Sequence, residues 1–154
     1  MLRHRAILPL APSAAWLIKA ARLPDTVAHA WRKGRCADLT AGTSWDLVEL
    51  PFETGRKAMA VLDEQHFHIG PYLLSGIDRA MWVMLPLGTA HRLSGAPDVI
   101  VRPPGWQLRA PAPGRYSDRL WLPPSGGRKP ELTNTGALLA ALHELARRPV
   151  VRCQ

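Results

Sequence analysis

Apolar and polar positions change their period several times along this chain, most clearly in its middle third. An apolar-rich run over residues 45–51 ends at a proline and predicts a strand. After a turn at residues 52–55, apolar side chains recur at helical spacing over residues 56–65. Two further apolar runs, 72–75 and 80–85, predict strands that a short polar link joins as a hairpin. The order strand, helix, strand, strand predicts a mixed α/β core.

Helical periodicity also marks the N-terminal part of the chain. Ser13 is a suitable cap for a helix over residues 14–22, whose apolar side chains share one face. Asp25 or Thr26 then caps a second helix, which Gly34 ends. We therefore expect two short helices before the core.

The second half of the chain carries the remaining elements. Short strands are predicted at residues 36–40, 97–102, 106–110 and 119–122. Thr133 or Asn134 caps a C-terminal helix over residues 135–148, which has a leucine-rich stripe. In the sequence, the core is thus expected to follow two short helices and to precede one longer helix.

The length of 154 residues is enough for one domain with a hydrophobic core and too short for two. We expect a single domain over residues 1–154. Its parts are an N-terminal helical part (1–41), a core (42–127) and a C-terminal helix (131–150).

The formal net charge of +8 and the isoelectric point near 10.5 favour an acidic partner. Nucleic acid is the first candidate and a membrane surface the second. A basic surface that only aids solubility is the alternative, because an arginine-rich composition can follow from codon bias.

Cysteine use and hydropathy bear on the compartment. Cys36 and Cys153 have neither metal-site nor disulfide spacing, so free thiols in a reducing cytoplasm are expected. No segment reaches the roughly eighteen apolar residues that a membrane span needs. We expect a cytoplasmic protein without a membrane partner.

Few residues have the spacing of a reactive site, and no common enzyme motif is present. His66 and His68 could bind a metal, with a solvated helix end as the alternative. Among strand carboxylates, Asp46, Glu49 and Asp98 could hold a divalent ion for phosphoryl transfer. Asp46 and Glu49 are three residues apart and face opposite sides of a strand, so ordinary surface carboxylates are the alternative.

The order of these segments resembles a known family. The resemblance rests on the strand at 45–51, the helix led by Gly55, Gly70-Pro71, and the segments 75–85, 98–102, 104–111 and 121–126. In this order they resemble the bifunctional primase–polymerase domain of the archaeo-eukaryotic primase superfamily, especially its divergent actinobacterial members. The resemblance implies an α+β fold: a mixed, mostly antiparallel sheet with an RRM-like core, and helices at both ends of the chain.

The resemblance also implies where catalytic residues would lie. Family members hold metals with an acidic pair on the first strand and a third aspartate, and a histidine contacts the nucleotide. Aligned on the proline that ends the first strand, the acidic pair falls at Val48 and Leu50, and the histidine falls near Ala80 or Met81. Asp98 matches the third aspartate.

A shifted register would recruit Glu49 beside Asp98, with Mg²⁺ or Mn²⁺ as the cofactor. Phosphoryl transfer depends on positioned metal and charge. With two of the three catalytic elements missing, we expect no polymerase activity and no cofactor.

Basic residues interleaved with aromatic ones crowd the second half of the chain. The basic residues are Arg102, Arg109, Arg115, Arg119, Arg128 and Lys129, and the aromatic ones are Trp106, Tyr116 and Trp121. This composition suits single-stranded nucleic acid, because cations follow phosphates and rings stack on bases. We expect Arg102 and Arg109 to approach each other across a hairpin. A solvated basic face with core aromatics is the alternative.

Three functions follow from these features. The first is a degenerate primase–polymerase-like domain that binds DNA, RNA or nucleotides in replication or regulation of a chromosome or mobile element. The second is an active primase–polymerase that uses Glu49 and Asp98. The third is a protein-interaction module that kept the fold, with a partner that the sequence does not identify.

Overall fold

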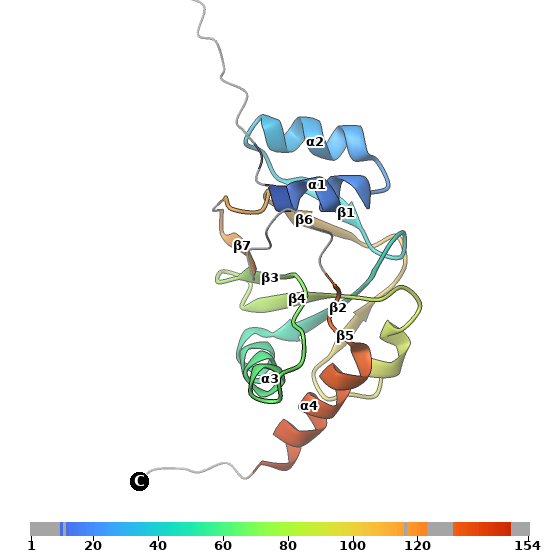
Figure 1. Ribbon diagram of the computed structural model, residues 1–154, viewed down its shortest axis with the longest axis vertical. Helices are drawn as coiled ribbons and strands as arrows, with labels where there is room; N and C mark the ends of the chain where they lie inside the picture. Colours follow the sequence, from blue (N-terminus) through green and yellow to red (C-terminus); the bar gives the residue numbers. More distant parts are fainter. Residues whose placement is uncertain (1–9, 11, 116, 123–130, 149–154) are drawn as a thin grey trace, which may run out of the picture.

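The computed structural model describes residues 10, 12–115, 117–122 and 131–148 (Figure 1). Its helices are α1 (Pro12–Lys19), α2 (Pro24–Arg32), α3 (Phe52–Glu64), the short 3₁₀ helix η1 (Ala90–Leu93) and α4 (Thr135–Arg147). Its strands are β1 (Ala37–Thr40), β2 (Asp46–Pro51), β3 (Tyr72–Ser75), β4 (Ala80–Leu85), β5 (Ile100–Arg102), β6 (Gln107–Ala110) and β7 (Arg119–Leu122). The α+β class is confirmed.

Helix starts differ from the predicted ones in three places. Ser13 lies inside the first turn of α1, and α2 begins at Pro24, so neither Asp25 nor Thr26 is its cap. Proline suits the first turn because the helix needs no N–H there. The predicted turn at residues 52–55 is the first turn of α3, which follows β2 directly.

The cap of α4 is as predicted. The Asn134 side chain accepts a hydrogen bond from the backbone N–H of Ala137 at 2.9 Å. This bond satisfies one of the free donors that every helix N-terminus presents.

The strands form two antiparallel sheets, whereas one mixed sheet was expected. The larger sheet has five strands in the order β5-β2-β4-β3-β7, and the smaller pairs β1 with β6. All strand pairings in the described part of the chain are antiparallel. As predicted, β3 and β4 are neighbours in the sheet that contains β2.

The expected hairpin that would bring Arg102 and Arg109 together is not formed. Arg102 on β5 is opposite Leu47 of β2, whereas Arg109 on β6 is opposite Asp38 of β1, in the other sheet. Prolines 103 and 104 lack N–H groups and cannot extend a ladder from β5. The chain instead crosses to the end of β1, where the Gly105 N–H donates to the Ala41 carbonyl at 2.8 Å.

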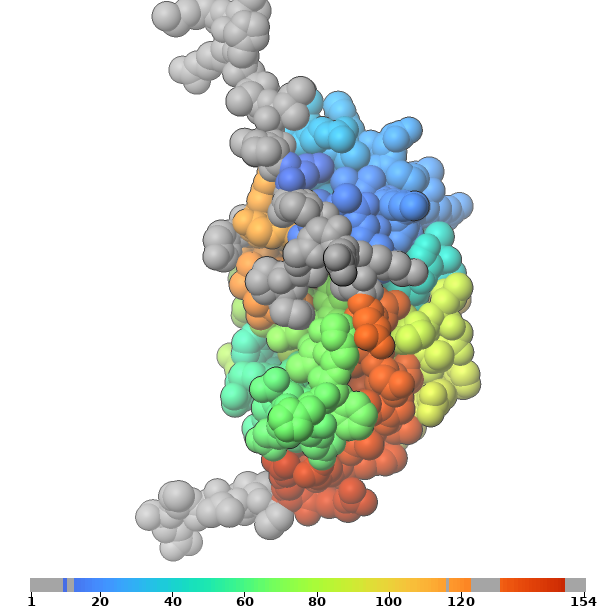
Figure 2. Space-filling view, viewed as in Figure 1, coloured from blue at the N-terminus to red at the C-terminus, as the bar shows by residue number. Residues whose placement is uncertain are grey.

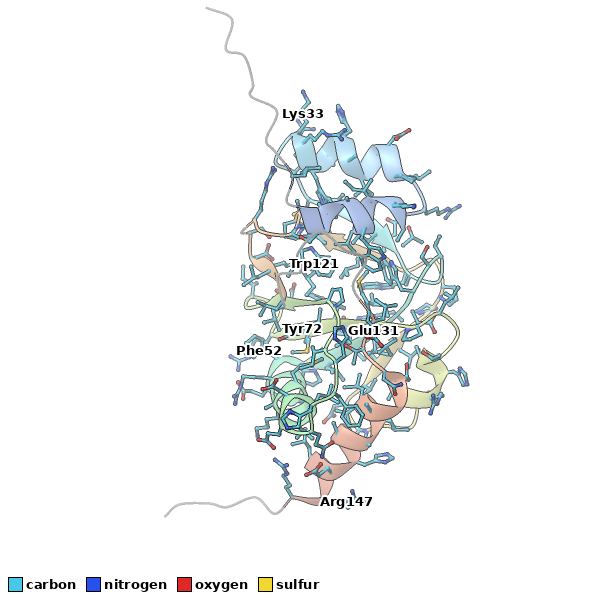
Figure 3. The ribbon with its side chains drawn as sticks, viewed as in Figure 1. Lys33, Phe52, Tyr72, Trp121, Glu131 and Arg147 are labelled. Carbon is cyan, nitrogen blue, oxygen red and sulfur yellow. The ribbon has the colours of Figure 1, made fainter. Side chains whose placement is uncertain are left out.

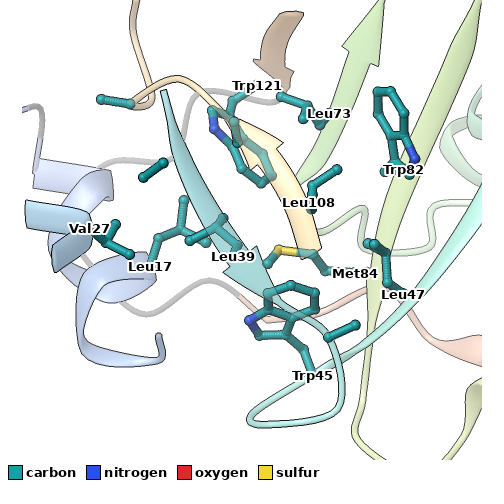
Figure 4. Packing of buried hydrophobic residues seen from close by; sticks show 14 of the residues in the cluster. Leu17, Val27, Leu39, Trp45, Leu47, Leu73, Trp82, Met84, Leu108 and Trp121 are labelled. Carbon is teal, nitrogen blue, oxygen red and sulfur yellow. The ribbon is translucent and has the colours of Figure 1, made fainter. Parts of the chain in front are cut away.

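The five-stranded sheet is a middle layer between two hydrophobic cores. On one face, Val48 and Leu50 pack with residues of α3 and α4, including the fully buried Leu62. On the other face, Leu47 and Met84 pack with residues of β1, β6 and the N-terminal helices (Figure 4). The N-terminal helices and the small sheet of β1 and β6 lie at one end of the molecule, and α3 and α4 lie at the other (Figure 1 and Figure 2).

Close packing of α3 on the sheet explains the glycine in its first turn. A Cβ atom at Gly55 would lie 2.6 Å from the Met81 sulfur, closer than real side chains approach. A larger residue at this position would require the Met81 side chain to move.

Candidate nucleic-acid interface

On the sheet face that is turned away from α3 and α4, the partly exposed Glu49 and Arg102 lie beside the core residue Trp82. Glu49 of β2 is the centre of this cluster. Its Oε1 accepts hydrogen bonds from Trp82 Nε1 at 2.6 Å and from Arg102 Nη2 at 2.8 Å. Trp82 is directly opposite Glu49 in the strand register, so the indole and the carboxylate are brought together by the pairing of β2 with β4.

Arg102 also stacks on an aromatic ring. Its guanidinium carbon lies 4.6 Å from the centre of the Trp106 ring. The Arg102 and Glu49 side chains are 26% and 18% exposed, so the ion pair is partly shielded from water. The Arg102 Nε atom is buried without a hydrogen-bond partner, so the guanidinium is not fully satisfied in this position.

Arg119 covers the other side of this cluster. Its guanidinium carbon lies 4.5 Å from the centre of the Trp82 ring. Its Nη2 donates to Asp78 Oδ2 at 3.1 Å, and its Nη1 donates to the Arg109 carbonyl at 2.6 Å. With its side chain 20% exposed, Arg119 links β7 to β6 and to the turn between β3 and β4. These contacts make it part of the fold.

Two other predicted basic residues, Arg109 and Arg115, lie away from this cluster. Arg109 projects into solvent with 65% of its side chain exposed, and its Nη1 lies 3.5 Å from Asp38 Oδ1. Arg115 lies at the end of α2, where its Nη1 donates to the Trp31 carbonyl at 2.7 Å. Arg128 and Lys129 lie outside the described residues.

Trp121, a further aromatic candidate, adds no exposed ring to the site. Trp121 is buried in the core, and its Nε1 donates to the Pro111 carbonyl at 2.7 Å. Tyr116 is outside the described residues. Trp106, which is partly exposed beside Arg102, is the aromatic side chain of the predicted set that a ligand could reach.

The candidate metal ligands lie on opposite faces of the sheet. Glu49 faces Trp82, whereas Asp98 lines an open groove of about 620 Å³ between α3 and α4. Asp98 precedes β5 in the left-handed backbone region (φ 60°). Asp46 accepts a hydrogen bond from the Ala90 N–H at 2.9 Å, which holds η1 against β2. The pairing of Glu49 with Asp98 that an active polymerase would need is therefore absent from this arrangement.

Other groups that sequence reasoning singled out are also kept apart. Val48, Leu50, Ala80 and Met81 are buried apolar residues. His68 Nε2 lies 2.8 Å from the Glu131 carbonyl oxygen, and His66 is exposed. Within the described residues, no group of three or more His, Cys, Asp or Glu side chains is placed to hold a metal ion.

Sequence reasoning missed Trp82 and Asp78, the two partners that hold this cluster together. A signal existed in the strand register. Once β4 pairs with β2, Trp82 is opposite Glu49, and its indole N–H has a carboxylate within reach. Finding it required the pairing of β2 with β4, which a pattern along one strand does not give.

In the described part of the chain, no helix has the length and apolar character to cross a membrane. Comparison of the chain with protein families, with curated proteins and with solved structures finds no match.

Proposed function

We propose that the chain is a degenerate primase–polymerase-like domain that binds nucleic acid, or a nucleotide, without synthesising a strand. The proposal takes its core to be RRM-like. The strand order β5-β2-β4-β3 supports this. It is the order that the four strands of a β-α-β-β-α-β unit take in split βαβ folds. The short helix η1 occupies the chain position of the second helix in such folds, and α4 packs on α3 in the helical layer.

The observation that carries the binding proposal is the Arg102–Trp106 stack at the uncovered end of the sheet face, with Arg109 in solvent on the neighbouring sheet. A partly exposed indole offers a surface on which a base stacks, and an exposed guanidinium offers donors to a phosphate. The net charge of +8 adds an attraction for a polyanion at long range.

The side chains around β2 favour binding over synthesis. Val48 and Leu50, at the positions of the family's acidic pair, are buried against the helical layer and have no oxygen to offer a metal. Glu49 Oε1 already accepts two hydrogen bonds, one of them from a cation, so a metal ion bound there would compete with Arg102. Asp98 lies across the sheet from Glu49.

The test is binding of a fluorescently labelled single-stranded oligonucleotide, followed by anisotropy over a range of salt concentrations. Each lost phosphate contact lowers the slope of log affinity against log salt by about 0.7 for a single strand. We expect Arg109→Ala to reduce the slope by about this amount. Arg147→Ala is the matched control, since it removes an exposed arginine at the other end of the molecule (Figure 3).

Arg119→Ala is not a suitable variant for this purpose, although the sequence alone suggested it. Its side chain is bound to Asp78, to the Arg109 carbonyl and to the Trp82 ring, so its loss would disturb the fold. A wild-type protein without measurable binding at low salt would favour the protein-interaction module instead.

A further inference from the structure

Three exposed cations without a carboxylate partner among the described residues lie close together in the sequence at the C-terminal end of α2. Arg32, Lys33 and Arg35 are exposed on the last turn of α2 and the loop after it. None of them is in an ion pair with another described residue. Over residues 12–36, five lysines and arginines stand against the single acid Asp25. This end of the molecule therefore carries uncompensated positive charge.

The arginines of the sheet region differ in this respect. Arg102 is paired with Glu49, Arg119 with Asp78, and Arg109 with Asp38. The pairs of Arg102 and Arg119 are partly buried and neutralise much of their attraction for a phosphate, whereas the exposed pair of Arg109 with Asp38 weakens its attraction only in part. The three unpaired cations at the end of α2 lie outside the segment that the sequence suggested as a binding surface.

The end of α2 is held firmly against the β6 side of the protein. The Trp31 ring is fully buried, and its Nε1 donates to the Ala110 carbonyl at 3.0 Å. Arg115 donates to the Trp31 carbonyl, which fixes a further arginine next to the three exposed cations. Side chains mounted on a rigid element lose less entropy when they bind a ligand.

The chemistry of this surface favours nucleic acid over a lipid membrane. An interfacial helix inserts a large apolar face into the lipid. The apolar face of α2 is already used, since Val27 and Trp31 are buried in the core. Of the exposed large apolar side chains among the described residues, Leu23 lies at the opposite, N-terminal end of α2, and the others lie outside this helix, at Phe67, Ile77, Leu87 and Ile100. Cations without an exposed apolar neighbour suit a phosphate backbone.

We propose that the C-terminal end of α2, formed by Arg32, Lys33 and Arg35 together with Arg115, binds the phosphate backbone of a single-stranded nucleic acid. The inference rests on the proposed function and names its main backbone contact. The strand runs from the Arg109 region of β6, along the segment that joins β6 to Arg115, to the end of α2. These contacts position the strand and carry no base specificity.

The experiment compares two double variants that change the net charge equally. Lys33→Glu/Arg35→Glu alters the proposed surface, and Lys57→Glu/Arg147→Glu alters exposed cations on α3 and α4, at the opposite end of the molecule (Figure 3). Binding of a labelled single-stranded oligonucleotide is measured by anisotropy at several salt concentrations. Thermal melting verifies that each variant is folded, and Lys33→Gln/Arg35→Gln replaces the first variant if it is not.

We expect the α2 variant to weaken binding at low salt at least about tenfold and to lower the salt slope by about 1.4, the value for two phosphate contacts. The control should stay within about threefold of wild type, the scale of a general charge effect. Wild-type binding with equal losses in both variants, or with no loss in the α2 variant, overturns this inference and leaves the proposed function in place.

Two further outcomes would affect the proposed function or the class of ligand. No wild-type binding at low salt contradicts the proposed function itself. Binding to vesicles that contain phosphatidylserine, stronger than to the oligonucleotide and lost in the α2 variant, overturns the nucleic-acid inference in favour of a membrane surface.

Discussion

The guanidinium of Arg119 covers the ring of Trp82, with 4.5 Å between the guanidinium carbon and the ring centre. The sequence places Arg119 among the candidate nucleic-acid-binding arginines, whereas this contact gives it a structural role. Arg119 joins β7 to the middle of the larger sheet and, through the Arg109 carbonyl, to β6 of the smaller one. Its main role in the described structure is to hold the two sheets together.

Arg119→Ala is therefore expected to destabilise the protein by about 2 kcal/mol, because it removes a cation–π contact and a charged hydrogen bond to a carbonyl. Urea unfolding followed by tryptophan fluorescence measures the change. Arg109→Ala is the control and should cost less than about 0.5 kcal/mol, since its exposed ion pair with Asp38 contributes little. Equal stability of the two variants would disprove the role assigned to Arg119.

Leu62 tests the packing of α3 on the sheet. Its side chain is fully buried between α3 and the strands, and its truncation leaves a cavity. We expect Leu62→Ala to cost about 2–5 kcal/mol in free energy of unfolding. Leu87→Ala, at a site that is 52% exposed, should cost less than about 0.5 kcal/mol. If the Leu62→Ala protein had the same melting temperature as the wild type, the placement of α3 on the sheet would be wrong.

Tyr72 gives the stability a dependence on alkaline pH. Burial raises the pKa of its hydroxyl above the ordinary value of 10.0. Above pH 10 the unfolded chain loses this proton before the folded one does, so the tyrosine contributes stability below pH 10 that is lost as the pH rises.

Two measurements check this prediction. Absorbance titration should find one tyrosine that ionises above pH 10, and Tyr72→Phe should abolish that transition; the chain has only two tyrosines. The alkaline loss of stability should be smaller in Tyr72→Phe than in wild type. A titration of Tyr72 at or below pH 10 would contradict the burial of its hydroxyl.

The hydrophobic period predicted much of the fold, because it reports directly which faces are buried. The strand at β2, the body of α3 and the hairpin of β3 and β4 were all predicted in place. The pairing of β6 with β1 was not. It depends on two prolines that end one ladder and on Gly105, which binds the Ala41 carbonyl far back in the chain. Such contacts leave no periodic pattern of apolar residues in the sequence.

The candidate site was predicted less well, for an electrostatic reason. The sequence locates the charges, but their effect depends on which charges meet in the fold. Glu49 and Arg102 are distant in sequence and form an ion pair, whereas Lys33 and Arg35 have no carboxylate partner among the described residues. The number of arginines therefore favoured the second half of the chain, although three unpaired cations lie at the end of α2.

Synthesis of a strand is not expected from this protein. With a primed template, nucleotides and either Mg²⁺ or Mn²⁺, we expect no incorporation, because Val48 and Leu50 cannot ligate a metal and Glu49 is bound by Arg102. A primer-extension assay with pure protein measures this. Template-dependent extension that Asp98→Ala abolishes would instead establish an active polymerase that uses Asp98.

The most direct test of the account is the affinity of the wild-type protein for a single-stranded oligonucleotide as the salt concentration rises. Phosphate contacts by Arg109, Lys33 and Arg35 predict that log affinity falls against log salt with a slope of about 2 or steeper. Binding at low ionic strength with that slope is the expected result. Absence of binding at low salt, or binding that salt does not weaken, would contradict the claim that this domain holds a nucleic acid by its phosphates.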